Sequence, residues 1–166
     1  LIGHYYRDGR EHWIGGPEAD FRVPSYCGLK ALIVTTIGDV MLIAGILITF
    51  AYSGTLNFLE LYHTAPVWMA NMVKTPGLLA LTGILLIGGP MGKSAQFPLH
   101  EWLPDAMAGP APVSALIHAA TMVKAGVYLV ALLSPIFYFG YHVAGYPEAA
   151  SFFMLTIAIG AFTLFL

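Results

Sequence analysis

Four ionisable side chains stand inside apolar runs, where a charged group is costly. They comprise one carboxylate, one imidazole and two amines: Asp39, His118, Lys93 and Lys124. A charged side chain at the centre of a membrane-spanning helix costs about 2.5–3.5 kcal/mol on insertion scales. Histidine titrates near neutral pH, and desolvation favours the neutral form of a buried amine. These residue types in apolar surroundings therefore predict a proton relay.

The residues directly before Lys93 are helix breakers. Gly88-Gly89-Pro90-Met91-Gly92 lies in the apolar run 77–97. Proline removes a backbone donor, and glycine offers no steric resistance to unwinding. Interrupted helices at mid-membrane depth form the ion sites of many transporters. We predict a break at 88–92 that exposes Lys93 to an internal site, the alternative being a kinked structural helix whose lysine reaches the membrane surface.

The run 112–138 carries polar side chains at helical spacing. With about 100° per residue, five of them fit within a sector of about 120°: Ser114, His118, Thr121, Lys124 and Tyr128. His118 and Lys124 would be about 9 Å apart along the axis, with Thr121 between them. The spacing predicts a polar stripe suited to proton transfer, whereas a lone histidine would more often be a packing residue.

Asp39 lies near the middle of the run 31–52. A carboxylate buried there needs a partner, so we expect a lysine beside it as part of the relay. The alternative is a structural ion pair or a hydrogen-bonded carboxylate that only docks helices. Two further acids, Glu101 and Asp105, follow Lys93 in a polar connection. We expect them on the surface, with a proton entrance as the alternative.

Membrane-spanning helices are the elements that must position these groups. Hydrophobic residues make up 58% of the chain, mean hydropathy is +0.75, and only 10% of residues are charged, against about 25% in soluble domains. A net charge of -2 argues against a nucleic-acid partner, and the single Cys27 excludes an internal disulfide. Because no strand alternation recurs, we predict an all-α, polytopic transmembrane helical bundle. Its spans, each of about 20 residues, are expected near 31–52, 77–97, 112–138 and 149–166. We expect all of them to belong to one membrane domain over 1–166, in which residues 1–6 are the tail of a preceding span.

Charge in the connections predicts the orientation of the bundle. The first connection holds four basic residues: Arg7, Arg10, Arg22 and Lys30. The connection 53–76 holds only Lys74, so the positive-inside rule places the first connection on the cytoplasmic side. Trp68 and Trp102 stand near predicted span ends, where tryptophan commonly anchors a helix at the membrane interface.

Two long motifs point to a family. They are Gly92 to Met107 (GKSAQFPLHEWLPDAM) and Gly109 to Val123 (GPAPVSALIHAATMV). Both closely resemble the large antiporter-like subunit of respiratory complex I, subunit L, and the homologous large subunit of Mrp-type cation/proton antiporters. Ile37-Gly38-Asp39-Val40 is similar to a neighbouring segment of that family. The resemblance extends across essentially the whole chain, which reads as a fragment of such a subunit.

This resemblance implies inverted helical repeats, each with a discontinuous helix that carries a central lysine. Lys93 matches that lysine in the first repeat, and His118 matches the histidine of the following helix. The chain would then form part of one half-channel in a multi-pass subunit of the inner or cytoplasmic membrane. The implied parent complex is a redox-driven proton pump, oxidising NADH, reduced deazaflavin or ferredoxin. Other subunits would bind the electron donor, so no cofactor is expected in this chain, and its partners would be other membrane subunits.

Two departures from the family pattern keep alternatives open. Many relatives carry a basic residue just before the Gly-Asp pair, where this chain has Thr35-Thr36-Ile37. Lys124 is more similar to antiporter-type and some archaeal versions. A subunit of a Mrp-type Na+/H+ antiporter is therefore the second hypothesis, and a structural membrane scaffold is the third.

Overall fold

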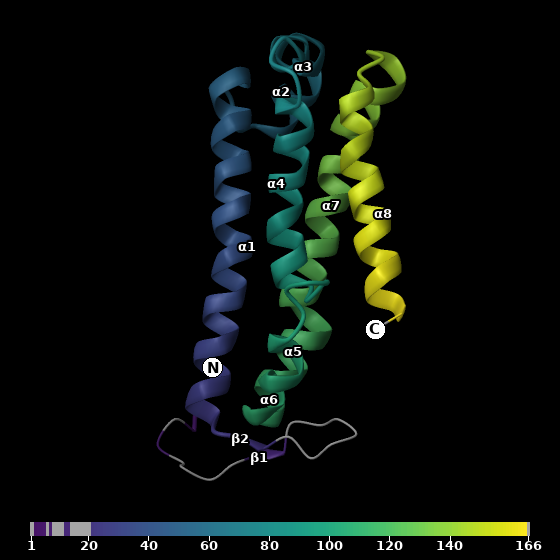
Figure 1. Cartoon of the computed structure of the whole chain (residues 1–166). Coiled ribbons are helices and arrows are strands. Elements are labelled where there is room, and N and C mark those ends of the chain that lie inside the picture. Colours follow the sequence, from purple (N-terminus) through teal and green to yellow (C-terminus); the bar gives the residue numbers. More distant parts are fainter. Residues whose placement is uncertain (1, 6, 8–11, 14–20, 166) are drawn as a thin grey trace.

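The computed structural model describes residues 2–5, 7, 12–13 and 21–165, and these form an elongated helical bundle (Figure 1). One short antiparallel pair of strands precedes it, β1 (His12–Trp13) and β2 (Phe21–Arg22), with His12 opposite Arg22. Residues 2–5 form turns. Two residues of the predicted span tail at 1–6, Leu1 and Tyr6, lie outside the described residues.

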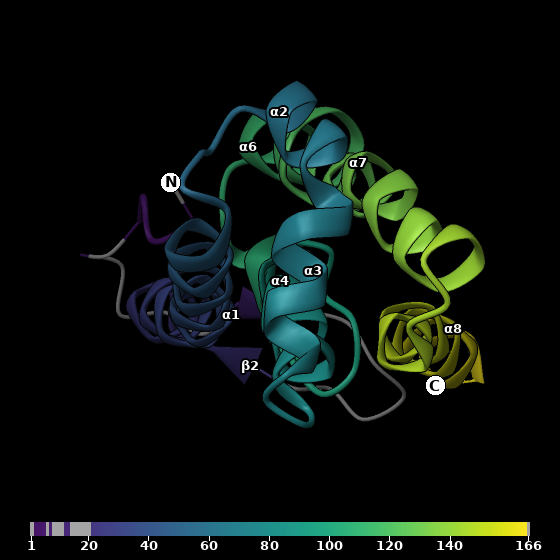
Figure 2. The same ribbon diagram turned by 90° about the horizontal axis from the view of Figure 1, so that it is seen from above.

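Long helices run side by side along the bundle. They are α1 (Pro24–Ser53), α4 (Leu78–Lys93), α7 (Met122–Tyr138) and α8 (Ala150–Phe165). Helix α4 contacts α1 on one side and α7 and α8 on the other, as the view down the bundle shows (Figure 2). Within the described residues, 24–53, 111–143 and 147–165 are each long and apolar enough to cross a membrane.

Short helices close the two ends of the bundle. At one end, α2 (Phe58–His63) and α3 (Ala65–Val73) join α1 to α4, and α3 is bent by 114° from α4. The α3–α4 pair together meets the criteria for a fourth, broken span. At the other end, before α7, lie α5 (Trp102–Asp105), η1 (Ala106–Ala108), α6 (Ala111–Ala115) and η2 (Leu116–Ala120). Two further short helices follow α7, η3 (Phe139–Val143) and η4 (Pro147–Ala149). Of these, η2 and η3 are π-helices and η1 and η4 are 3-10 turns.

The main apolar core lies beneath α3, between α4, α7 and α8. Phe137 and Phe152 stack with ring centroids 4.4 Å apart, and Met69 and Leu79 are fully buried beside them. Trp68 belongs to this core, with only 3% of its surface exposed. The prediction that Trp68 anchors the bundle at the membrane interface is wrong. Helix α3 turns across the bundle, and the Trp68 indole donates to Leu61 O at 3.0 Å.

Helix α4 continues through its glycines and proline to Lys93, so the predicted break at 88–92 is wrong. The glycines serve close packing instead. A Cβ atom on Gly38 of α1 would lie 2.6 Å from the Gly88 carbonyl oxygen, and one on Gly89 would meet Leu42 at the same distance. Where two backbones approach so closely, neighbouring helices hold the residues in helical conformation despite the missing proline donor.

The interruption of this segment follows Lys93. Ala95 adopts a left-handed backbone with φ 48°, and regular helix resumes only at α5. The interruption therefore lies after Lys93, at the carboxyl end of α4, and not at 88–92. Figure 1 shows α4 ending well inside the bundle, with α5 and α6 continuing below it.

We expect Gly38→Ala to separate α1 from α4. Its new methyl group would meet backbone atoms of α4, which cannot rotate away, and overpacking of this kind costs about 1–3 kcal/mol. Thermal unfolding of the purified full-length subunit measures the loss. Gly160→Ala in α8 is the matched control, because a Cβ there meets nothing within 4 Å. Equal melting temperatures for the two variants would show that this contact is not tight.

Candidate functional site

An ion pair joins the end of α4 to the middle of α1. Lys93 Nζ donates to Asp39 Oδ2 at 2.8 Å, and the two side chains are 34% and 38% exposed. Lys93 is the last residue of α4, where the free carbonyls of a helix end favour a cation. Asp39 thus has the lysine partner that we expected, although the basic residue common in the family before Gly38 is absent here.

An open-sided cavity of about 560 Å³ adjoins Lys93. Its walls include Ala31 and Thr35 of α1, and Ile117 and Thr121 beside α7. A water molecule occupies roughly 30 Å³ in the liquid, so this space has room for a chain of waters. Lys93 and residues of η2 (Leu116–Ala120), the segment that carries His118, therefore line one cavity.

His118 stands in the π-helix η2. Its Nε2 atom is buried and has no hydrogen-bond partner among the described residues. The ring lines a second cavity of about 390 Å³ together with Ser114, Met107 and Gly109. Buried polar nitrogens are normally satisfied by protein or by water, so this nitrogen lacks the usual partner among the described residues.

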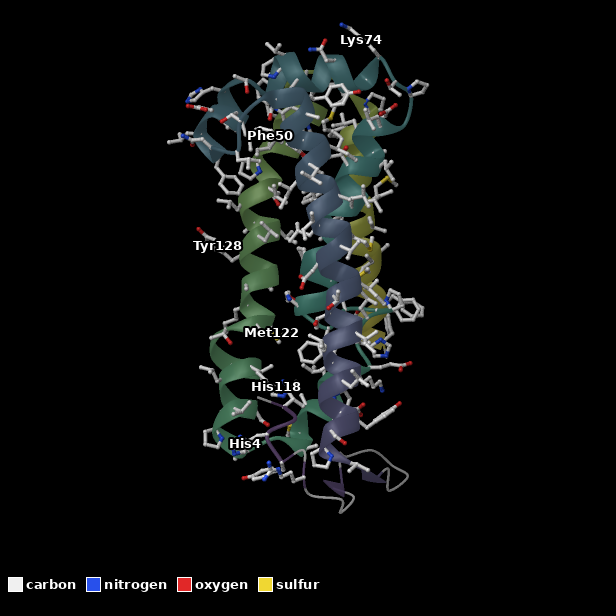
Figure 3. All side chains as sticks on the ribbon, turned by 90° about the vertical axis from the view of Figure 1, so that its left-hand side faces the viewer. His4, Phe50, Lys74, His118, Met122 and Tyr128 are labelled. Carbon is white, nitrogen blue, oxygen red and sulfur yellow. The ribbon has the colours of Figure 1, made fainter. Side chains whose placement is uncertain are left out.

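The polar stripe predicted along 112–138 does not form as one face. A π-helix has a wider turn than an α-helix, and Thr121 after it has φ -122° and ψ -74°, so regular spacing is lost between His118 and Lys124. Ser114 is buried, whereas Tyr128 is 68% exposed and points away from the other helices (Figure 3). Lys124 is also exposed, and it makes no hydrogen bond or ion pair within the described part of the chain.

The structure therefore brings together Lys93 and Asp39 directly. His118 lines a different cavity from Lys93, and Lys124 lies on an exposed face of α7. No group of three or more His, Cys, Asp or Glu side chains among residues 2–5, 7, 12–13 and 21–165 is placed to hold a metal ion.

Two hydrogen bonds fix the segment after Lys93 against α7 and α8, and the sequence did not predict them. Ser94 Oγ donates to Val123 O at 2.6 Å, and the Phe97 amide donates to Thr163 Oγ1 at 3.1 Å. Gly126 of α7 packs on Pro90 and Ser94, where a Cβ would lie 2.9 Å from the Pro90 carbonyl oxygen. In the sequence, Gly126 is the feature that could have indicated this close approach, because a small residue lets two helices come near each other.

The acidic connection is only partly at the surface. Glu101 has a side chain 69% exposed, as expected, but Asp105 is 3% exposed and its carboxylate lies 3.0 Å from Lys30 Nζ. Trp102 is fully buried, so its predicted role as an interface anchor is also wrong. Both corrections have one cause, because α5 folds back against α1 and turns these side chains inward.

These features define a polytopic helical membrane protein with an acid–base pair inside its bundle. The family model described as "NADH:quinone oxidoreductase/Mrp antiporter, TM" matches residues 20–165. The chain belongs to this family.

Curated relatives agree with that assignment. The chain is 48% identical over 137 residues to NAD(P)H-quinone oxidoreductase subunit 5, chloroplastic, of Brachypodium distachyon, covering 82% of this chain and 17% of the relative. It is 47% identical over 131 residues to NADH-quinone oxidoreductase subunit L of Escherichia coli, covering 79% of this chain and 19% of the relative. The chain thus spans less than a fifth of the length of these relatives.

Proposed function

We propose that the chain is part of a proton-translocating membrane subunit of a complex I-like, redox-driven pump. The observation that carries this proposal is the Lys93–Asp39 ion pair at 2.8 Å, inside the bundle and beside a cavity large enough for water. The names of the relatives support it, because they describe quinone oxidoreductase subunits. Intramembrane ionisable pairs are the usual components of proton relays.

In the proposed relay, Asp39 stabilises the ammonium form of Lys93, and loss of the Lys93 proton leaves the Asp39 carboxylate without its counter-charge. Water in the adjoining cavity receives the proton and carries it towards η2, since the cavity wall includes Ile117, the residue next to His118. His118, the residue after Ile117, is the next acceptor in this relay. Lys124, on the exposed face of α7, passes it to groups beyond this chain.

The proposed subunit performs no electron transfer itself. It lies in the inner or cytoplasmic membrane, with other membrane subunits as partners, and other subunits hold the electron donor and its cofactors. In this arrangement the redox reaction changes the electrostatic field at the Lys93–Asp39 pair, and the pair responds by taking up or releasing a proton.

Purification of the complete subunit with its natural partners tests this proposal. We expect redox subunits to copurify, together with proton uptake that depends on an electron donor and is unaffected by sodium. A complex without redox subunits, whose proton flux requires sodium and is lost in Asp39→Asn, would instead identify an antiporter.

A further inference from the structure

A second ion pair joins α1 to the segment that follows Lys93. Lys30 Nζ lies 3.0 Å from Asp105 Oδ2 and 3.5 Å from Glu101 Oε2. The Asp105 side chain is only 4% exposed, the Glu101 side chain is 69% exposed, and the Lys30 side chain is 21% exposed. One lysine of α1 therefore holds a buried carboxylate of α5, with an exposed carboxylate nearby.

Trp102 connects this ion pair to the end of α4. It lies on α5 with Asp105, is fully buried, and donates from Nε1 to the Gly92 carbonyl oxygen at 3.0 Å. That carbonyl has lost its usual helical donor, because the Gln96 amide donates to Met91 O instead. The indole thus satisfies a buried acceptor in the peptide group directly before Lys93.

These contacts form a closed loop that begins and ends on α1. It runs from Lys30 to Asp105, through Trp102 to Gly92, and from Lys93 back to Asp39. Lys30 and Asp39 are nine positions apart, or about 13 Å along a helix with a rise of 1.5 Å per residue. The position of the last turn of α4 therefore depends on how α5 is held against α1.

We propose that Lys30 and Asp105 are positioning residues for Lys93. Their ion pair fixes α5, and α5 holds the end of α4 through Trp102, so that Lys93 Nζ stays within hydrogen-bonding distance of Asp39. This inference rests on the proposed function of the Lys93–Asp39 pair. Neither Lys30 nor Asp105 contacts that pair, and both act through the backbone at Gly92.

Asp105→Asn and Glu101→Gln in the complete complex, reconstituted in vesicles, form a matched pair for the test. Each removes one negative charge beside Lys30, but only Asp105 is buried. Protons translocated per electron are measured as a function of pH and normalised to assembled complex. We expect Asp105→Asn to give a ratio between those of the parent and Lys93→Ala complexes, with a shifted pH profile. We expect Glu101→Gln to match the parent, and Asp105→Glu to restore the ratio.

A purely structural role for Asp105 predicts a different result. The amount of assembled complex would fall, but the ratio and pH profile of the assembled fraction would equal those of the parent, which would overturn the positioning role. Should Asp105→Asn prevent assembly altogether, Lys30→Gln removes the same ion pair from the side of α1, and a parent ratio in its assembled fraction would likewise overturn the positioning role. Lys93→Ala, measured in parallel, separates the two proposals: an unchanged ratio in that variant refutes the proposed function, whereas a fall in Lys93→Ala alone refutes only the positioning role.

Discussion

A complex carrying Lys93→Arg is expected to assemble normally and to lose proton translocation through this subunit. Arginine keeps the positive charge and can still donate to Asp39, so the ion pair and the packing of α4 on α1 are retained. A guanidinium group does not release its proton in proteins. Because losing a positioned acid–base group typically costs about 10²–10⁴-fold, flux through the site should fall by about 100-fold or more.

Vesicles containing the complete complex allow this expectation to be measured as protons translocated per electron. Lys74→Arg is the matched control, because Lys74 is exposed at the end of α3 and, within the described residues, bonds only to the nearby Asn71 side chain. A normal ratio in the Lys93→Arg complex would mean that Lys93 contributes fixed charge and does not exchange a proton.

Asp39→Asn is expected to lower both proton translocation and assembly. Asparagine has nearly the same shape and still offers an oxygen to Lys93 Nζ, but it leaves the ammonium without a counter-charge inside the bundle. Breaking a fully buried pair costs about 3–5 kcal/mol. Both side chains here are about one-third exposed, so screening reduces the cost and part of the complex should still assemble.

The amount of assembled subunit and the proton-to-electron ratio report these two effects separately. Asp39→Glu retains the charge with one more methylene group, so we expect it to assemble normally and to recover much of the ratio. If Asp39→Asn assembled in normal amount and pumped normally, the ion pair would be dispensable for proton transfer and the lysine alone would be the relevant group.

Apolar runs with few charges were sufficient to predict an all-helical membrane bundle, because a span requires about 20 apolar residues whatever its neighbours are. The ionisable residue types likewise pointed to Asp39 and Lys93, since a charge inside a span demands a partner. The sequence indicated that a lysine would face Asp39, and the packing of α4 on α1 determines that it is Lys93.

Local helix rules failed where tertiary contacts decide the backbone. Gly88 and Gly89 read as helix breakers, but they allow α1 and α4 to approach closely, and α4 stays helical to Lys93. The π-helix η2 could not be anticipated from residue spacing, so the predicted stripe over 112–138 failed. Asp105 is buried only because α5 folds back to meet Lys30, which is a long-range contact.

Proton transfer by Lys93 is tested by the number of protons translocated per electron in the complete complex carrying Lys93→Ala. Removal of the amine deletes the titratable group and leaves the remainder of α4 in place. Lys93→Ala, like Asp39→Asn, leaves one charge of the pair without its partner, so some loss of assembly is expected and the ratio is normalised to assembled complex. If Lys93 transfers protons, that ratio is clearly below the ratio of the parent, with Lys74→Ala unchanged. An assembled Lys93→Ala complex with the parent ratio would show that Lys93 transfers no proton and would favour a structural scaffold.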